Sequence, residues 1–188
     1  MTTKRKFIQS IPNEMIDPIT GLKASNETEL STLLAYHHAN SSIDWSNVNL
    51  YSIPYLSDKL FASEYINCSS PFYCEYPLFS DSETVDIWGQ MPADLLSFSK
   101  NENTIVLIEN KIGSKFTSAG TQLIRQAKFL DKSGFKNKIL IVLTSELFLS
   151  KGWYLSEMQN VIDNVESVKV FAMKWEDIFN AIDFTYQT

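Results

Sequence analysis

The sequence predicts an α/β fold in which helices flank a mixed β-sheet, and three observations support this class. Residues 137–145 ("NKILIVLTS") form an uninterrupted apolar run, as expected for a strand that is covered on both faces. A helical pattern over 118–134 separates this run from another apolar strand at 104–112, and a strand–helix–strand order favours parallel pairing. The segment 71–79 alternates and is rich in aromatic residues, which is typical of an antiparallel meander.

Length and composition favour one folded domain. The chain has 188 residues, of which 44% are hydrophobic, enough to bury a core. We expect an N-terminal arm over 1–23, where periodicity is weak, and a single domain over 24–188. No apolar run approaches the roughly 20 residues of a membrane span, so no membrane partner is expected. Cys68 and Cys74 match neither the usual zinc spacing nor a redox pair, which favours a reduced, cytoplasmic protein.

Two helices are predicted in the first part of the domain. The first covers 25–40, where Asn26 can act as the N-cap and Glu29 follows three residues later. The second covers 55–67 and begins after Pro54. These helices precede the meander, so the predicted chain order starts with helical segments.

The meander itself is predicted from three segments. The strand at 71–79 is followed by the turn "SDSET". Residues 85–98 form one bent strand or two, because Gly89 and Pro92 interrupt the pattern. The turn "KNEN" then leads into the strand at 104–112.

The remainder alternates helices and strands. The helix at 118–134 ends at a glycine, and the buried strand at 137–145 follows it. A helix over 153–164, a strand over 167–174 and a closing helix over 175–184 complete the order. This alternation is the pattern that predicts a sheet with parallel strands and covering helices.

Three residues with ionisable side chains lie at the ends of two adjacent predicted strands. Asp94 begins one strand, and Glu109 and Lys111 end the next. Residues two apart on a strand face the same way, so Glu109 and Lys111 share a face and Asn110 points to the other. Two converging carboxylates repel each other unless a cation lies between them, and oxygen ligands with spare positions suit Mg²⁺. A cation, a water and a nearby lysine are the components of phosphodiester hydrolysis.

These residues resemble a known family. Asp94, fourteen further residues and "ENK" at 109–111 are similar to the PD-(D/E)XK motif of restriction-endonuclease-like nucleases, with "PAD" at 92–94 in place of the family's "PD" element. The wording "ENKI", followed by a helix that contains Gln122, is similar to one branch of the family. The order of elements over 75–144 fits the family's core. The resemblance implies an αβββαβ core with a C-terminal βα extension and a Mg²⁺-dependent nuclease, most readily acting on DNA, in which Mn²⁺ can substitute.

The resemblance also implies a role for each residue of the motif. Asp94 and Glu109 would bind the metal, with the carbonyl of Asn110 as a further ligand. Lys111 would position or activate the attacking water. Gln122 would pack near the lysine and support the site.

Some assignments stay open at this stage. The family often carries an additional acid on its first helix, which places Glu29 in the metal site, with Glu27 as the alternative. Asp86 in "VDIW" is an alternative to Asp94 as the metal ligand. The chain also departs from the family at Gln126, where an aromatic residue is common.

Charge is unevenly distributed along the chain. The net charge of −6 argues against a polyanionic partner, but the segment 100–138 holds eight basic residues and three acids. Within it, Lys115, Arg125 and Lys128 are predicted to contact the phosphate backbone of nucleic acid. The alternative is that they form an ordinary solvated helix face.

Other functions are compatible with the same residues. The chain can be a non-catalytic binding module of this fold or a subunit of a larger complex, which its acidic charge favours. An RNase or effector nuclease is a second alternative. Cutting both strands of a duplex needs two sites, so a homodimer is a further expectation. A role in bacterial or phage defence follows from the family resemblance alone.

Overall fold

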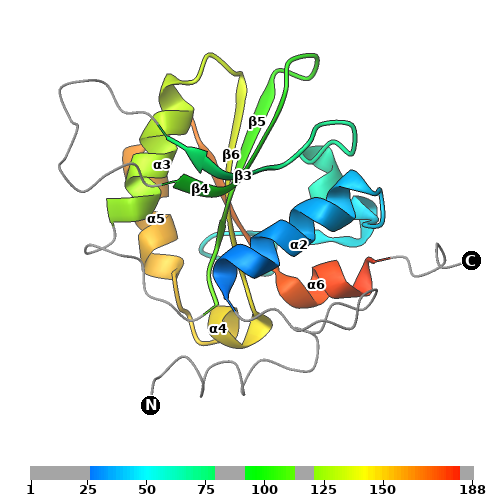
Figure 1. Cartoon of the computed structure of the whole chain (residues 1–188). Helices are drawn as coiled ribbons and strands as arrows, with labels where there is room; N and C mark the ends of the chain where they lie inside the picture. The colour runs from blue at the N-terminus through cyan, green and yellow to red at the C-terminus, as the bar shows by residue number, and fades with distance from the viewer. Residues whose placement is uncertain (1–25, 79–91, 113–120, 183–188) are drawn as a thin grey trace, which may run out of the picture.

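The computed structural model describes residues 26–78, 92–112 and 121–182, which build one mixed β-sheet with helices against both faces (Figure 1). This confirms the predicted α/β class. The predicted N-terminal arm, Asp86 and Lys115 lie outside the described residues. None of the described helices has the length and apolar character that a membrane crossing requires.

The sheet has seven strands in the order β2-β1-β7-β6-β5-β4-β3. They are β1 (Asn49–Ser52), β2 (Lys59–Phe61), β3 (Tyr73–Pro77), β4 (Pro92–Ser99), β5 (Thr104–Asn110), β6 (Asn137–Thr144) and β7 (Lys169–Lys174). The central strands β5, β6 and β7 are parallel, and all other pairs are antiparallel. The β3-β4-β5 meander and the parallel pairing of β5 with β6 agree with the prediction.

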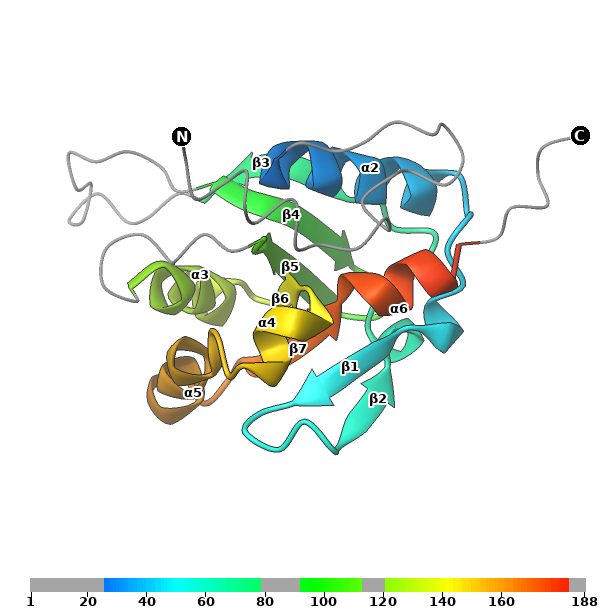
Figure 2. The same ribbon diagram turned by 90° about the horizontal axis from the view of Figure 1, so that it is seen from below.

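The helices form two layers. They are α2 (Glu27–Ala39), α3 (Thr121–Lys132), α4 (Glu146–Ser150), α5 (Leu155–Asn164) and α6 (Trp175–Asn180), with short 3₁₀ turns at Trp45–Asn47 and Ala62–Glu64. Figure 2 shows α3 and α5 on one side of the sheet and α2 and α6 on the other. The short helix α4 was not predicted.

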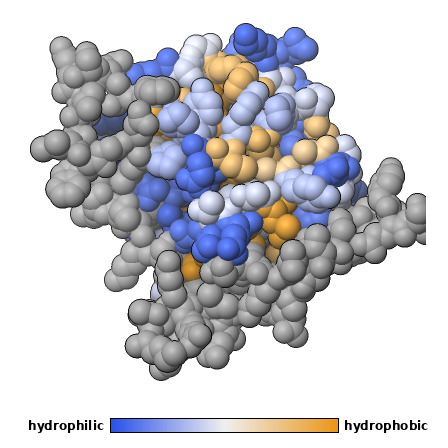
Figure 3. All heavy atoms as spheres, viewed as in Figure 1, coloured by the Kyte–Doolittle hydropathy of each residue, from blue (hydrophilic) through white to orange (hydrophobic). Residues whose placement is uncertain are grey.

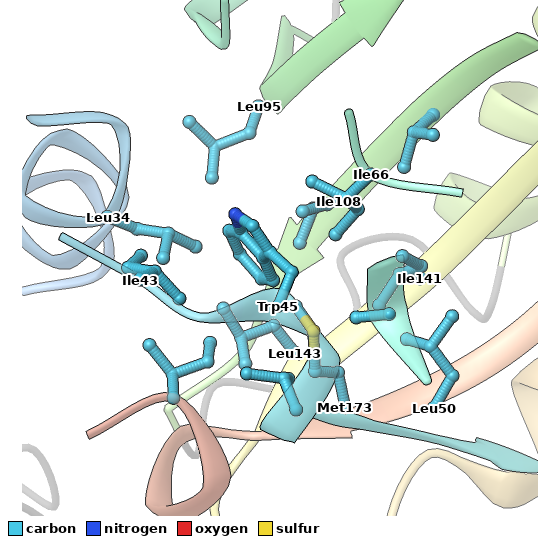
Figure 4. Packing of buried hydrophobic residues seen from close by; sticks show 14 of the residues in the cluster. Leu34, Ile43, Trp45, Leu50, Ile66, Leu95, Ile108, Ile141, Leu143 and Met173 are labelled. Atoms are coloured by element: carbon cyan, nitrogen blue, oxygen red, sulfur yellow. The ribbon is translucent and has the colours of Figure 1, made fainter. Parts of the chain in front are cut away.

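Each face of the sheet has its own hydrophobic core. On the α2 and α6 face, Trp45 packs among Leu34, Ile108 and Ile141 (Figure 4). On the α3 and α5 face, a second cluster contains Leu107 together with residues of both helices. Every side chain of β5 is buried, because this central strand is covered on both of its faces. The polar residues of this segment are therefore confined to the strand's ends.

The predicted helix over 55–67 was wrong. Its middle residues form strand β2, which pairs with β1 and places Leu60 opposite Leu50 at the edge of the sheet. The Ser52 N–H donates to the Asp58 carbonyl at 2.8 Å and closes this hairpin. The stretch then continues into the 3₁₀ turn at Ala62–Glu64. Pairing with a strand from earlier in the chain thus overrides the local helical pattern.

The Asn110 side chain ties the carboxyl end of β5 to both helices of one layer. It is fully buried, and its Nδ2 donates to the Glu27 carbonyl at 3.0 Å and to Ser31 Oγ at 3.3 Å. Its Oδ1 accepts from Trp175 Nε1 at 2.9 Å. One polar side chain therefore sets where the first turns of α2 and α6 lie relative to the end of β5.

This arrangement predicts a specific cost for removing the indole donor. Trp175→Phe keeps an aromatic ring but leaves Asn110 Oδ1 buried without its donor, so we expect a loss of about 1–3 kcal/mol in the free energy of unfolding. Chemical denaturation measures this loss. The control is Trp153→Phe, which changes an exposed tryptophan and should stay within about 0.5 kcal/mol of the wild type. Equal stability of Trp175→Phe and the control would contradict the role of Asn110.

Candidate active site

The candidate site lies where β4 and β5 separate. Their ladder ends at the pair Leu95 and Ile108. Beyond it, Asp94 Oδ2 accepts the Asn110 N–H at 2.6 Å, so a side-chain oxygen takes the place of a ladder carbonyl. This bond holds the Asp94 carboxyl beside the strand end that carries Glu109.

Glu109 is the most deeply buried acid of the site, with 1% of its surface exposed. Its Oε1 accepts from Lys111 Nζ and from Gln122 Nε2, both at 2.5 Å. Its Oε2 accepts from Gln126 Nε2 at 2.5 Å. Gln122 and Gln126 are four residues apart on α3, so both point from one face of that helix. Glu109 and Lys111 share a face of the sheet, as the alternation of a strand requires.

The structure brings Glu27 rather than Glu29 to this site. Glu27 Oε1 accepts the Ile112 N–H at 3.0 Å, and its Oε2 lies 4.0 Å from Lys111 Nζ. Glu29 is exposed, and its N–H is capped by the Asn26 side chain at 2.8 Å, as predicted for the N-cap. Two residues apart on a helix correspond to about 200° of rotation, so only one of the two acids can face β5.

Burial and the repulsion between negative charges control the protonation of Asp94 and Glu109, which we call the acid pair. Burial, together with the charge of Glu109, raises the pKa of Asp94 to about 8. Burial likewise raises the pKa of Glu109. Burial alone would lower the pKa of Lys111, but the charges of Glu109, Glu27 and Asp94 outweigh it and raise that pKa. Lys111 is therefore a cation at neutral pH, and Asp94 holds a proton as long as no other positive charge is present.

Mg²⁺ prefers oxygen ligands, and the site contains a small number of them. Among the residues that the structure describes, no three His, Cys, Asp or Glu side chains converge as a ligand group. The backbone N–H of Lys111 donates to the Leu143 carbonyl of β6 at 2.8 Å. In a trans peptide the N–H and the preceding carbonyl point in opposite directions. The Asn110 carbonyl therefore points away from β6, toward the side of Asp94. The oxygen atoms that could coordinate a cation here are those of Asp94, Glu109 and this carbonyl. One or two carboxylates, with water in the other positions, is the usual way in which proteins bind Mg²⁺.

Unpaired oxygen atoms near Glu109 support this fit. Within the part of the chain that the structure describes, Gln122 Oε1, Gln126 Oε1 and Thr144 Oγ1 are buried and have no hydrogen-bond partner. Thr144 is two residues after Val142, which pairs with Glu109, so its side chain lies on the same face of the sheet. A site with more acceptors than donors and a surplus of negative charge matches a hydrated cation, whose waters are donors.

The other predicted residues lie apart from the acid pair. Arg125 and Lys128 are exposed on the outer side of α3, which is rotated away from the side that carries Gln122 and Gln126. Gln126, which stands where the resembled family commonly has an aromatic residue, is fully buried against Glu109. Its i, i+4 spacing from Gln122 was the signal that could have identified it.

Comparison of the chain with protein-family models, curated proteins and solved structures found no match. The geometry alone therefore defines the class of site. It is a buried pair of acids with a protonated lysine and two supporting glutamines, at the carboxyl end of a central strand. Such perturbed acids are typical of catalytic or metal-binding positions.

The raised pKa of Asp94 predicts a particular pH dependence of stability. The folded protein binds the Asp94 proton up to about pH 8, whereas the unfolded chain releases it near the ordinary value of 3.8. Between these limits the folded state holds more protons, so its stability should fall as pH rises, by up to about 1.4 kcal/mol per pH unit for one group. Asp94→Asn cannot ionise and should show a shallower decline. Denaturant unfolding of both proteins from pH 5 to 8.5, without metal, measures the difference, and parallel curves would contradict it.

Proposed function

We propose that this protein is a Mg²⁺-dependent nuclease of the PD-(D/E)XK type that hydrolyses phosphodiester bonds in DNA. The observation that carries the proposal is the convergence of Asp94, Glu109 and Lys111 at one buried point. The chain order also supports a restriction-endonuclease-like core, since α2, the β3-β4-β5 meander, α3 and β6 follow one another as αβββαβ. The β1-β2 hairpin is inserted after α2, and β7 with α6 forms the C-terminal extension.

Lys111 has the properties of a hydrogen-bond donor in this chemistry. Three acids act on it and raise its pKa, so it stays protonated at neutral pH. A protonated amine cannot take a proton from water, but it can orient the attacking water and stabilise negative charge that develops on the phosphate. We therefore assign Lys111 to positioning and charge stabilisation rather than to the role of general base.

Asp94 and Glu109 would hold the cation together with the Asn110 carbonyl. When bound, a divalent cation polarises the phosphate and neutralises charge that develops on it. Asp94 would release its proton on binding, because the raised pKa reflects the lack of a compensating positive charge. Gln122 and Gln126 keep the Glu109 carboxylate in one orientation through a hydrogen bond to each oxygen.

The outer side of α3 would contact the nucleic acid backbone. Arg125, Lys128 and Lys132 are exposed at i, i+3 and i+7, which places them in one stripe along the helix. The glutamine face of the same helix contacts Glu109, so the stripe and the acid pair are held by one rigid element. Such contacts position the substrate without reading its sequence.

A non-catalytic binding module of the same fold is the second candidate. The observation in its favour is that both Glu109 oxygens already accept hydrogen bonds from Lys111, Gln122 and Gln126. A purely structural ion pair would look the same. The two candidates differ in metal binding, because a scaffold has no need to bind Mg²⁺ or Mn²⁺.

Two substitutions separate the roles of the acid and the lysine. Lys111→Ala should lower cleavage of plasmid and linear DNA in Mg²⁺ or Mn²⁺ by at least about 100-fold, but it should keep metal binding because no ligand is lost. Glu109→Gln should lose both. Calorimetric titration with Mn²⁺ and a cleavage assay with an EDTA control measure the two properties. Lys151→Ala, which removes an exposed lysine elsewhere, is the control. Equal Mn²⁺ affinity of wild type and Glu109→Gln would refute the assignment.

The basic stripe predicts the salt dependence of binding. Replacing Arg125 and Lys128 by Ala should weaken binding of two unrelated duplexes to a similar extent, because phosphate contacts are independent of sequence. The slope of log affinity against log salt should become shallower by about 2, since each lost contact removes about 0.9. A double Ala variant of Lys59 and Lys151, both exposed away from α3, is the matched control. An unchanged slope would place the nucleic acid on another surface.

A further inference from the structure

A row of aromatic side chains lies on the α3 face of β3 and β4. The rings of Tyr73 and Phe98 are stacked, with centroids 5.5 Å apart and an interplanar angle of 12°. Tyr73 also meets Tyr76 edge-on at 6.1 Å, and Phe98 meets Phe135 at 6.1 Å. We call these four residues the aromatic strip. Tyr76, Phe98 and Phe135 are half-buried against the core of this face, so the strip has a fixed base.

The strip starts beside the candidate active site. Tyr76 pairs with Ala93, the residue before Asp94, and Tyr73 pairs with Leu96 further along β4. The strip therefore runs away from the acid pair along the edge of the sheet. Tyr73 is 42% exposed, although its ring is stacked on that of Phe98. Figure 3 shows apolar surface among polar side chains over this part of the molecule.

Basic side chains of α3 lie on the same face of the sheet as the strip. On the side of α3 near α5, the Asp131 carboxylate accepts a hydrogen bond from Ser167 Oγ, which lies in the connection between α5 and β7. Arg125, Phe129 and Lys132 lie on the other side of the helix, which is turned toward β4 and β3 because α3 lies between these strands and α5 (Figure 2). Aromatic rings and exposed cations thus lie on the same face of the sheet.

We propose that the aromatic strip is a stacking platform for unpaired bases and that the nucleic acid reaches the site as a single strand. This proposal rests on the proposed function and names the form of its substrate. Bases within a duplex already cover each other's faces, so an aromatic side chain can stack only on a base that is unpaired. One face of Tyr73 lies against Phe98, and a base on the other face would continue the stack.

The charges agree with this occupant. A single strand presents bases on one side and phosphates on the other, which matches an aromatic floor beside Arg125 and Lys132. Stacking needs no particular base, so the platform would bind single strands of different sequence with similar affinity. The acid pair at the end of the strip would then receive the backbone of the bound strand.

Binding of the full-length protein in EDTA tests the platform without cleavage. The probes are a labelled single-stranded DNA and the blunt duplex of the same sequence, followed by fluorescence anisotropy. Tyr73→Leu keeps an apolar side chain but has no π-face, and it should weaken binding of the single strand about tenfold while leaving duplex binding unchanged. Tyr73→Trp should retain single-strand binding. Tyr55→Leu, at a tyrosine that is 73% exposed outside the strip, is the matched control and should change neither.

Several outcomes would overturn the platform. These are an unchanged affinity of Tyr73→Leu for the single strand, an equal loss for both probes, or a loss in Tyr73→Trp as large as in Tyr73→Leu, which would indicate a structural role. Thermal unfolding of each variant confirms that it is folded. Metal-dependent cleavage of duplex DNA by a protein that fails these tests would leave the proposed function standing. Absence of wild-type binding to both probes would contradict the platform and the proposed function together.

Discussion

The burial of the Glu109 carboxylate is the constraint on which the rest of the site depends. β5 is covered on both faces, so an acid at its end cannot be hydrated as it would be on the surface. A buried ion costs several kcal/mol unless hydrogen bonds and an opposite charge compensate it. Lys111 and two glutamines of α3 supply that compensation. The same bonds fix the position of α3 over the end of the strand, and with it the outward stripe of Arg125 and its neighbours.

The two acids of the pair differ because their surroundings differ. From the described residues, Glu109 accepts three hydrogen bonds from side chains, whereas Asp94 accepts one from the Asn110 backbone. Burial and the neighbouring charge then push the pKa of Asp94 to about 8. Near neutral pH the site therefore sits close to a change of protonation, and an added positive charge would move it across. This asymmetry is the physical link between the fold and the proposed metal-dependent chemistry.

The three residues of "ENK" divide their work between the two faces of the sheet. Glu109 and Lys111 face α3 and form the candidate active site. Asn110 faces the other layer and holds α2 and α6 through Glu27, Ser31 and Trp175. The same bonds bring Glu27 near Lys111. Asn110 thereby adds a negative charge to the surroundings of Glu109 and Lys111.

Local sequence patterns determined much of this protein. Continuous apolar runs predicted β5 and β6 as buried strands, since only residues that are covered on both faces lack polar positions. Alternation placed Glu109 and Lys111 on one face, and the Asn26 cap marked the start of α2. Each of these features depends on residues that are close together in the chain.

Only the tertiary structure decided the features that depend on distant residues. The choice of Glu27 over Glu29 follows from how Asn110, about eighty residues later, orients α2. Within the segment at 55–67, Lys59–Phe61 form a strand because β1 offers a pairing edge. Gln126 donates a hydrogen bond to Glu109 only because α3 crosses the end of β5. In each case the local pattern allows more than one outcome, and burial of polar groups against partners far along the chain selects the one that satisfies their hydrogen bonds.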